Sequence, residues 1–427
     1  MLDIQTIRDD PERARQSMRD RGNPNVDAID RALACDTARR ETLTRLQEAQ
    51  ARSNAASKEI GALMKGGKKD EAQERIAETA RLKDQIKEGE EQARAAATEL
   101  ERVLMEVPNI PHESVPVGHS EAENKTVYEE GEPPVFDFEP LPHWELAARH
   151  GLIDFERGAK VTGAGFPFYL GQGARLQRAL INFFLDLAVA EGGYREMQPP
   201  YFVNEDSARG TGALPDKEDQ MYLIGRDGFY PIPTAEVPVT NYYRDEILAE
   251  ADLPIRLCAY TPCWRREAGS YGKHVRGLNR VHQFDKVELV RIVHPETSYE
   301  ALEELRDDAE RAVRGLGLPY RRLLMCTGDM GFNQAKQYDL EVWSAGQERW
   351  LEVSSVSNFT SYQARRMHLR YRPAEGGKPR IVHTLNGSGL ALPRIVATLL
   401  ENNQQADGSI VIPEALRPYT GFERIGG

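Results

Sequence analysis

A proline-free stretch from Val26 to Val103 limits the folds open to this chain more than any other feature. Alanine, glutamate, arginine, lysine and glutamine dominate the stretch, and all of them are strong helix formers. It is interrupted at Lys65-Gly66-Gly67-Lys68-Lys69, where adjacent glycines permit a tight turn. We therefore expect one long helix that folds back on itself as an antiparallel hairpin. Each arm of about 40 residues would be about 55 Å long.

The second half of this stretch carries a heptad pattern, in which apolar or small residues recur alternately four and three positions apart. The small residues in the pattern indicate that two helices approach closely. The first half has a less regular apolar stripe. The heptad positions are Leu82, Ile86, Gly89, Ala93, Ala96, Leu100 and Val103, and the stripe consists of Val26, Ile29, Leu33, Leu43 and Leu46.

The charge of the chain is unevenly distributed. Its 55 basic and 67 acidic side chains give a formal net charge of −12, which argues against a protein that coats nucleic acid indiscriminately. Residues 39–69 differ, because eight basic and three acidic side chains give them a local net charge of +5. Such a patch on an acidic body suits selective contact with a shaped polyanion. The candidate contact residues are Arg39, Arg45, Arg52, Lys58, Lys65, Lys68 and Lys69.

Two uses of the hairpin remain open at this point. Heptads most often form a dimerisation coiled coil, and a basic hairpin can instead act as an arm that contacts nucleic acid. The glycine turn favours pairing within one chain, and the basic excess lies toward the tip, where a dimer seam gains nothing. Both features favour the nucleic-acid arm.

At 427 residues the chain is longer than one ordinary domain, so we expect two domains. The hairpin would occupy residues 1–108, a proline- and glycine-marked linker residues 109–140, and a globular α+β domain residues 141–427. No apolar run is long enough to cross a bilayer, and the acidic N-terminal residues do not resemble a secretory signal. We therefore expect a cytoplasmic protein with no membrane partner.

The four cysteines, Cys35, Cys258, Cys263 and Cys326, are scattered along the chain. Cys258 and Cys263 have no second pair at the spacing of a zinc site. We therefore expect all four to be reduced and structural, with no bound zinc.

The segment from Trp264 to Leu289 is too charged for a core strand and contains too many glycines for one helix. An Arg-Arg-Glu sequence at 265–267 ends an apolar lead-in, and the alternating run from Val281 to Glu288 predicts a returning strand. Arginines bind phosphate oxygens and Phe284 offers a stacking face, so this hairpin could hold a polyanion. An ordinary exposed hairpin with solvated arginines is the alternative. The connecting loop contains Gly269, Gly272, Lys273, His274, Arg276, Gly277 and Arg280.

Residues 174–191 have helical apolar spacing and should form a buried helix. A strand from Tyr194 to Val203 follows, which Pro199 and Pro200 confine to an edge or an interface because proline cannot donate a ladder hydrogen bond. This helix and strand could form a dimer surface or could be covered by their own chain.

Three further clusters combine polar side chains with short apolar strands. In the last of them a glycine-relieved strand enters an apolar helix that has Arg394 in its first turn. A positive charge there is unfavourable to the helix dipole, so we expect Arg394 to bind an anion. The clusters are Thr234-Ala235-Glu236, Glu352-Val353-Ser354-Ser355, and Asn386 with Ser388 and Arg394.

In combination, these residues resemble the class II aminoacyl-tRNA synthetases. Residues 264–288, 352–355 and 390–394 look like motifs 2 and 3 of that class, and Pro199-Pro200 looks like the motif 1 proline. TAE at 234–236, CTGDMGFNQAKQYDLEVW at 326–343, TLNGSG from 384 and the hairpin narrow the resemblance to the seryl-tRNA synthetase family. The resemblance covers essentially the whole chain. One departure is Pro393, where many members have glycine.

The resemblance implies an antiparallel β-sheet catalytic domain, flanked by helices, that binds ATP and Mg²⁺. Arg265 would hold the α-phosphate and Arg394 the γ-phosphate, Glu267 would contact the adenine amino group, and Phe284 would stack on the base. Glu352 and Ser355 look like Mg²⁺ ligands. The expected catalytic residues are Arg265, Glu352 and Arg394, and the expected ATP-binding residues are Arg265, Arg266, Glu267, Val281, Phe284, Glu352, Val353, Ser354, Ser355 and Arg394.

The resemblance also implies a pocket for L-serine. Glu236 and Glu288 suit its ammonium and hydroxyl groups, and Thr234 and Ser388 suit hydrogen bonds nearby. Without the resemblance, Glu288 would be interpreted as a strand-face carboxylate paired with Lys286 or Arg291. The expected substrate-binding residues are Thr234, Ala235, Glu236, Arg265, Glu288, Asn386 and Ser388.

The polyanion implied for the hairpin is tRNA(Ser), with tRNA(Sec) as a second candidate, because this family reads the shape of tRNA and especially its long variable arm. The resemblance also implies a homodimer. Removal of residues 39–69 should leave serine activation intact and abolish tRNA charging. A paralogue that loads a carrier protein, or a non-catalytic tRNA-binding relative, are rival hypotheses. The intact hairpin argues against the first, and the retention of Arg265, Glu352 and Arg394 against the second.

Overall fold

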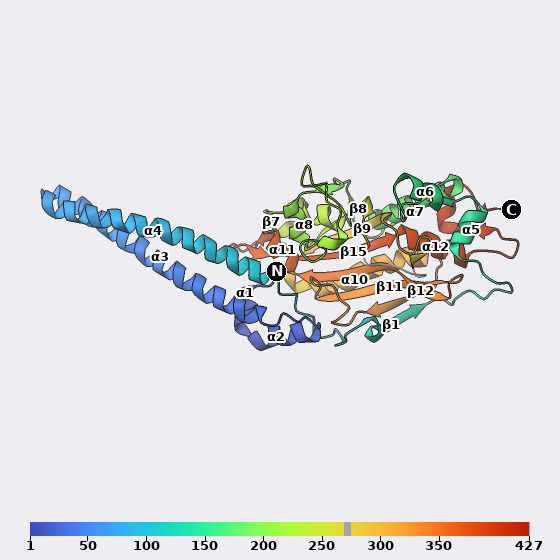
Figure 1. Cartoon of the computed structure of the whole chain (residues 1–427), viewed down its shortest axis with the longest axis horizontal. Helices are drawn as coiled ribbons and strands as arrows, with labels where there is room; N and C mark the ends of the chain where they lie inside the picture. The colour runs from blue at the N-terminus through green and yellow to red at the C-terminus, as the bar shows by residue number, and fades with distance from the viewer. Residues whose placement is uncertain (269–274, 427) are drawn as a thin grey trace. The chain divides into compact units, whose positions relative to one another are not determined.

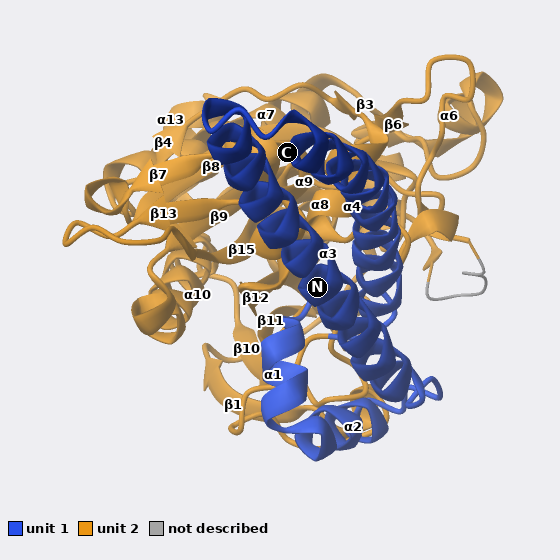
Figure 2. Ribbon diagram, turned by 90° about the vertical axis from the view of Figure 1, so that its left-hand side faces the viewer, with its two compact units in different colours: residues 1–108 blue, residues 109–427 orange. Residues whose placement is uncertain are grey.

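The computed structural model describes residues 1–268 and 275–426. The chain forms two compact units, Met1–Pro108 and Asn109–Gly427 (Figure 2). The first unit is helical, and the second contains every β-strand among the described residues.

The first unit is built on a helical hairpin, which confirms the prediction from the proline-free stretch (Figure 1). Its arms are α3 (Ala28–Lys65) and α4 (Lys69–Leu104). The chain reverses between them at Gly67, whose φ of +75° lies in the left-handed region that glycine adopts without steric cost. Two short helices precede the hairpin, α1 (Ile4–Asp9) and α2 (Pro11–Asp20).

The predicted heptad positions of α4 are all buried or half-buried. The arms approach closely at Gly89, where an added Cβ would lie 3.2 Å from Cδ1 of Leu46. Of the predicted apolar stripe, Ile29 is buried and the other four members are half-buried, and on α3 Thr42, Ala49 and Ala56 are also buried, at seven-residue spacing. Small and polar residues thus contribute to that half of the seam beside the apolar stripe.

The second unit is organised around a mostly antiparallel sheet with the strand order β1-β10-β11-β12-β15-β9-β8-β4. Only β4, at one edge, pairs in parallel with its neighbour. This architecture confirms the α+β prediction. The strands are β1 (Lys125–Glu130), β4 (Arg195–Glu196), β8 (Ile255–Trp264), β9 (Gln283–Val293), β10 (Tyr320–Leu324), β11 (Lys336–Ser344), β12 (Arg349–Thr360) and β15 (His383–Ala391).

Smaller sheets and helices complete this unit. The smaller sheets are β14-β13-β7, β16-β17, β2-β3 and β5-β6. Their strands are β2 (Ile153–Asp154), β3 (Phe168–Tyr169), β5 (Phe202–Val203), β6 (Tyr230–Pro231), β7 (Ile247–Ala249), β13 (Arg370–Arg372), β14 (Arg380–Ile381), β16 (Ile410–Val411) and β17 (Arg424–Ile425). The helices are α5 (His143–Arg149), α6 (Phe155–Val161), α7 (Gly171–Ala190), α8 (Glu205–Thr211), α9 (Glu236–Thr240), α10 (Ser298–Gly315), α11 (Tyr362–Arg366), α12 (Leu392–Asn402) and α13 (Arg417–Thr420).

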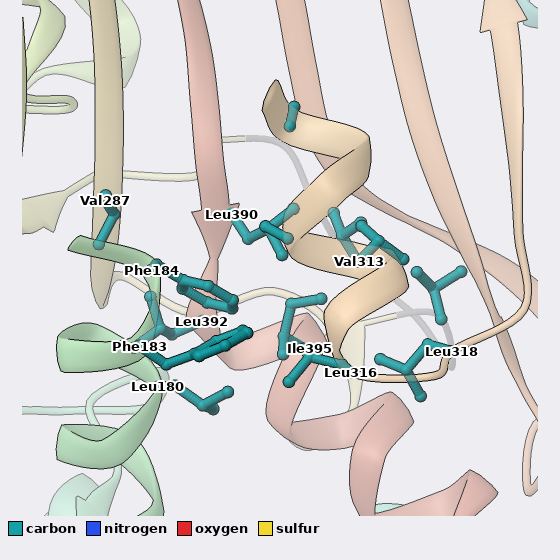
Figure 3. Packing of buried hydrophobic residues seen from close by; sticks show 14 of the residues in the cluster. Leu180, Phe183, Phe184, Val287, Val313, Leu316, Leu318, Leu390, Leu392 and Ile395 are labelled. Atoms are coloured by element: carbon teal, nitrogen blue, oxygen red, sulfur yellow. The ribbon is translucent and has the colours of Figure 1, made fainter. Parts of the chain in front are cut away.

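The main hydrophobic core lies between this sheet and the helices α7, α10 and α12 (Figure 3). Phe184 from α7, Val313 from α10 and Ile395 from α12 are each at most 2% exposed. Because α12 is anchored in this core, the polar residues at its first turn are held in place relative to the sheet.

Residues 109–140 differ from the expected linker. They belong to the second unit, and β1 within them pairs with β10 of the main sheet. The side chain of Asn109 donates hydrogen bonds to the carbonyl oxygens of Asn333 at 2.9 Å and Phe359 at 2.8 Å. The side chains of β1 are mostly exposed, so its sequence lacks the alternation that marks a half-buried strand.

The proline-containing segment lies at an edge of the sheet, as expected. Its first part forms the edge strand β4, and its end forms β5, which pairs with β6 in a separate sheet. Pro199 and Pro200 lie between the two strands. Within the described residues, no helix is both long and apolar enough to span a membrane.

Candidate active site

The motif that begins at Trp264 forms the end of β8 and its return through β9. Cys263 pairs with Phe284 in the ladder, and the backbone N–H of Arg265 donates to the carbonyl oxygen of His282 at 2.9 Å. This pairing places the Arg265 guanidinium over the ring of Phe284, 5.2 Å from its centroid. The residue expected to hold the α-phosphate and the residue expected to stack on adenine are therefore neighbours.

The other residues of this motif are also partly fixed. Glu267 has a φ of +48° and forms an ion pair with Arg280 at 2.6 Å. The backbone N–H of Arg266 donates to the carbonyl oxygen of Gln220 at 2.9 Å. Val281 is 5% exposed, so its side chain is largely covered. The predicted loop residues Gly269, Gly272, Lys273 and His274 lie outside the described residues.

Thr234 and Glu288, two of the residues expected in the serine pocket, belong to one hydrogen-bonded group. The Thr234 hydroxyl donates to Glu288 Oε2 at 2.8 Å and accepts from Lys286 Nζ at 2.9 Å. Lys286 and Glu288 form a direct ion pair on alternate positions of β9. The pairing with Lys286, which the sequence left open as an alternative for Glu288, is therefore present. Among the described residues, Glu288 Oε1 has no hydrogen-bond partner, which leaves it able to accept from a ligand.

Glu236 lies at the start of α9 and is held by a second polar chain. Gln363 donates to Glu236 Oε1 at 2.6 Å, and Thr384 donates to Gln363 Oε1 at 2.8 Å. Burial and the negative charge of Glu288 raise the pKa of Glu236. A cationic ligand would offset the repulsion between these two carboxylates, and an ammonium group is such a ligand.

The remaining residues expected in the serine pocket have different surroundings. Ser388 lies opposite Glu288 in the ladder between β15 and β9. Asn386 pairs with Val290 in the same ladder. The side chain of Ala235 is fully buried in a small apolar cluster that includes Val290. Ala235 therefore contributes packing beneath Thr234 and Glu236, its neighbours in the chain, and not a polar contact.

A bulge in β12 brings Glu352 and Ser355 to one face of the sheet. Glu352 pairs with Glu341 and Ser355 with Asp339, and the register skips Val353 between them. Because Asp339 and Glu341 are two positions apart on β11, their partners point to the same side. Ser354, by contrast, is buried and donates to the carbonyl oxygen of Ser388 at 2.7 Å.

Asp339 adds a second carboxylate beside Glu352 and Ser355. Burial and the negative charge of Glu352 raise its pKa well above the ordinary value, while hydrogen bonds from Gln337 and Ser355 oppose that rise. Two adjacent carboxylates and a hydroxyl are a suitable oxygen donor set for Mg²⁺. The described residues contain no group of three or more His, Cys, Asp or Glu side chains arranged as a metal site, so the remaining ligands would come from phosphate and water.

Arg394 connects this carboxylate group to the segment that leads into β9. Its Nη1 donates to the carbonyl oxygen of Glu352 at 2.7 Å and lies 3.4 Å from Glu352 Oε2. Its Nε donates to the carbonyl oxygen of Asn279 at 3.1 Å. Pro393 occupies the first turn of α12, a position that needs no N–H donor. Burial and the positive charge of Arg394 lower the pKa of Arg349, so these cations share one region.

Some site residues did not stand out in the sequence. In the sequence, Lys286 and Asp339 look like surface charges on alternating strands. In the structure both side chains are buried beside the expected site residues. Gln363 and Asn279 reach the site only through the tertiary fold. The signal that could have revealed Asp339 is its place in the YDLEVW sequence, where alternation puts it on the same face as Glu341.

The basic residues predicted on the hairpin extend from Arg39, in the first third of α3, to Lys69 at the start of α4. Arg45, Arg52, Lys58, Lys65, Lys68 and Lys69 are exposed, and Arg39 is half-buried. Arg39 pairs with Asp36 at 2.9 Å, and Lys68 pairs with Glu71 at 3.0 Å. Asp36 is buried, whereas both members of the Lys68–Glu71 pair are exposed, and an exposed pair is weak and exchanges readily for a phosphate partner.

The catalytic unit of a class II aminoacyl-tRNA synthetase is defined by an antiparallel sheet with three groups, an Arg-Glu pair, a carboxylate on a strand and an arginine on a helix. Here they are Arg265 and Glu267 after β8, Glu352 on β12 and Arg394 at the start of α12. Residues 222–403 match the family described as tRNA synthetase class II core domain (G, H, P, S and T). Residues 1–111 match the seryl-tRNA synthetase N-terminal domain. These matches, together with the similar proteins described next, show that the chain belongs to the seryl-tRNA synthetase family.

The similar proteins cover the chain from end to end. The serine–tRNA ligase of Salinibacter ruber is 64% identical and covers 100% of this chain and 99% of its own length. The serine–tRNA ligase of Geobacter sulfurreducens is 51% identical with complete coverage of both. The crystal structure of the Pyrococcus horikoshii seryl-tRNA synthetase complexed with ATP is similar at a TM-score of 0.92 and 36% identity, covering 100% of this chain and 99% of that one.

Proposed function

We propose that this protein is a serine–tRNA ligase that activates L-serine with ATP and transfers it to the 3′ end of tRNA(Ser). One observation carries the proposal. The Arg265–Phe284 pair, the Glu352–Arg394 pair and the Thr234–Glu288 pair lie on or beside the neighbouring strands β8, β9, β15 and β12. Cationic and aromatic groups for a nucleotide thus lie beside a polar pocket for a small zwitterion.

The first step needs little covalent help from the protein. The serine carboxylate attacks the α-phosphorus of ATP, the bond to the β-phosphate oxygen breaks, and pyrophosphate leaves. Because the nucleophile is already ionised, no general base is required, and catalysis consists of positioning and charge neutralisation. Arg265 would hold the α-phosphate and Arg394 the γ-phosphate, so that pyrophosphate can leave opposite the attacking carboxylate, and Phe284 would stack on the adenine.

Glu352 and Ser355, with Asp339 behind them, would hold Mg²⁺. Their oxygen donors and the raised pKa of Asp339 fit a cation at this position. When bound there, Mg²⁺ would neutralise phosphate charge and fix the phosphate oxygens. Arg394 lies beside the same carboxylate, so the negative charge of Glu352 is divided between the arginine and the metal region.

The pocket around Thr234 would select serine by its hydroxyl. Glu288 Oε1 and Glu236 offer acceptors for the ammonium and hydroxyl groups of serine. Alanine would leave at least one buried polar group of the pocket without a partner, which costs about 1–3 kcal/mol. Threonine would be excluded sterically by its additional methyl group.

The second step needs the tRNA, and we propose that the hairpin is the arm that binds it. The exposed basic residues from Arg45 to Lys69 support this role, because shape-specific recognition of folded RNA relies on backbone contacts. We further propose a homodimer in the cytoplasm, with tRNA(Sec) as a second tRNA substrate. No zinc is required by this scheme.

Serine-dependent exchange of pyrophosphate into ATP tests the proposal most directly. We expect exchange with serine at least about a hundredfold more efficient than with alanine, threonine or glycine, and charging of tRNA(Ser) in a second assay. Exchange without tRNA charging would favour the carrier-protein hypothesis. The absence of exchange with any of these amino acids would favour a non-catalytic tRNA-binding protein.

A further inference from the structure

A buried histidine, His143, contacts Gly277 and Leu278. Leu278 lies shortly before β9, and its backbone N–H donates to Nε2 of His143, at the start of α5, over 2.8 Å. Gly277 lies so close that an added Cβ would be 2.2 Å from the same nitrogen. Arg276 stacks over the ring of Trp144, 4.7 Å from its centroid. Helix α5 therefore supports several consecutive residues of this segment.

The histidine is itself fixed by Glu401 of α12. Both residues are fully buried, and His143 Nδ1 lies 2.7 Å from Glu401 Oε1. The same carboxylate accepts from the backbone N–H of His143 at 2.9 Å and of Gly346 at 3.1 Å, and from the Ser344 hydroxyl. Burial raises the pKa of Glu401, but the hydrogen bonds from His143 and Ser344 outweigh this effect and lower it overall. Glu401 is therefore ionised and acts only as an acceptor.

These contacts fix the tautomer of His143. Because the Glu401 carboxylate can only accept, Nδ1 of His143 must carry a proton and donate it. Because the backbone N–H of Leu278 can only donate, Nε2 must be unprotonated and accept. In this single orientation, the ring joins the ionised Glu401 carboxylate on α12 to the backbone N–H of Leu278.

A second path runs parallel to this one and ends at Arg394. Gln347 donates to Glu401 Oε1 at 3.0 Å and accepts from the Asn279 side chain at 2.8 Å. The carbonyl oxygen of Asn279 accepts from Nε of Arg394 at 3.1 Å. His143 and Gln347 are therefore both hydrogen-bonded to the Glu401 carboxylate, and they bind the adjacent residues Leu278 and Asn279.

We propose that His143 is a positioning residue for ATP binding. His143 holds residues 277–279 in place, so that the Asn279 carbonyl can orient the Arg394 guanidinium. The inference rests on the proposed function, since it assigns Arg394 to the ATP phosphates. Without the bond from His143, the segment is no longer fixed at Leu278, and ATP binding must restore its position. The serine pocket at Thr234, Lys286 and Glu288 has its own hydrogen bonds and does not depend on this connection.

Two substitutions of His143 separate positioning from packing. H143Q keeps an acceptor oxygen at about the reach of Nε2, whereas H143N keeps the group near Nδ1 and cannot reach Leu278. We expect H143N to raise the KM for ATP about tenfold in serine-dependent pyrophosphate exchange, the factor for one unmade buried hydrogen bond. H143Q should restore the KM to within about threefold of wild type, and the KM for serine should change less than about twofold in both. G277A, whose Cβ would collide with the His143 ring, should raise the KM for ATP as H143N does, by disturbing the other partner of the same contact.

His383 supplies a matched control. It is half-buried and hydrogen-bonded through Nδ1 to the Ser298 hydroxyl at 2.8 Å, at the end of β15 away from Arg394. We expect H383N to leave the KM for ATP unchanged, and thermal unfolding of every variant verifies that each is folded. An unchanged KM for ATP in folded H143N and G277A, or equal effects of H143N and H143Q, would overturn the proposal. If the wild-type protein shows no exchange, the proposed function itself fails, which is a distinct result.

Discussion

The hydroxyl of Thr234 donates a 2.8 Å hydrogen bond to Glu288, a residue 54 positions further along the chain. The same hydroxyl accepts from Lys286, so one threonine connects both members of a buried ion pair. A buried pair of this kind depends on its additional hydrogen bonds, because desolvation of the two charges offsets much of their attraction. Thr234 thereby orients Glu288 and leaves its second oxygen available to a ligand.

Replacement of Thr234 should therefore affect serine more than ATP. T234V keeps the shape of the side chain but removes the hydroxyl, and we expect it to raise the KM for serine by about tenfold or more. T234S keeps the hydroxyl and should remain within about threefold of wild type. Pyrophosphate exchange at varied serine and at varied ATP measures both effects. Equal KM values for serine in T234V and T234S would contradict the role of the hydroxyl.

The raised pKa of Glu236 predicts a pH-dependent stability. Burial and the charge of Glu288 raise the pKa above the value of 4.5 that the unfolded chain would have. The folded state therefore binds this proton more tightly, and the resulting stability is full below about pH 4.5 and is lost as the pH rises through the folded-state pKa. E236Q cannot ionise, so its stability relative to wild type should increase as the pH rises above about 4.5 in ligand-free urea unfolding. Parallel pH profiles of the two proteins would show that Glu236 is not the group responsible.

The bulge at Val353 distinguishes the two neighbouring serines of β12. Ser355 lies opposite Asp339 and would contact the metal, whereas Ser354 donates to the Ser388 carbonyl oxygen. We expect S355A to raise the Mg²⁺ concentration needed for half-maximal exchange by about fivefold to tenfold. S354A should change that concentration less and should instead lower thermal stability. The reverse order in a Mg²⁺ titration would place the wrong serine at the metal.

Two glycines of the hairpin should respond in opposite directions to substitution. At Gly89 an added Cβ meets Leu46, and a larger side chain should destabilise the hairpin by about 1–3 kcal/mol. Gly61 lies inside α3 with open space around it, so G61A should stabilise the helix by about 0.5–1 kcal/mol. Thermal unfolding followed by circular dichroism of G89V and G61A compares the two sites. A stabilised G89V would mean that the arms are not closely packed there.

The role of the hairpin can be tested by shortening both arms together. Gly89 contacts Leu46 and Arg75 pairs with Glu59, so removal of 39–69 alone would leave much of α4 without its partner. Replacement of residues 47–88 by a short glycine linker removes matched lengths of both arms instead. We expect serine-dependent pyrophosphate exchange within about twofold of wild type, and a loss of tRNA(Ser) charging of at least about a hundredfold.

Substitution of the basic residues by glutamine provides the control for that deletion. Changes at Arg52, Lys58, Lys65, Lys68 and Lys69 keep the helices and remove the charge. We expect weaker tRNA binding with a shallower salt dependence, because fewer counterions are released. Normal charging by the shortened protein would exclude the hairpin from tRNA recognition.

The hairpin could be predicted from sequence because its determinants are local. Helix propensity, the absence of proline and the glycine pair at 66–67 act within a few residues of one another. The seam of α4 followed from its heptads and part of the α3 seam from its apolar stripe, but the buried positions Thr42, Ala49 and Ala56 of α3 were not predicted, since small and polar residues mark a seam weakly. β1 was also missed, because an exposed edge strand has no alternation to detect.

By itself, the sequence determined the α+β class, the hairpin and the chemical groups available to the site: arginines for phosphate, carboxylates for cations and an aromatic face. The tertiary structure alone decided how these groups combine. A one-residue bulge selected Ser355 over Ser354, and the ladder placed Lys286 beside Glu288. The connection from Glu401 through His143 to Leu278 joins three distant segments. Register and long-range hydrogen bonds depend on which strands and helices meet, and short sequence patterns do not carry that information.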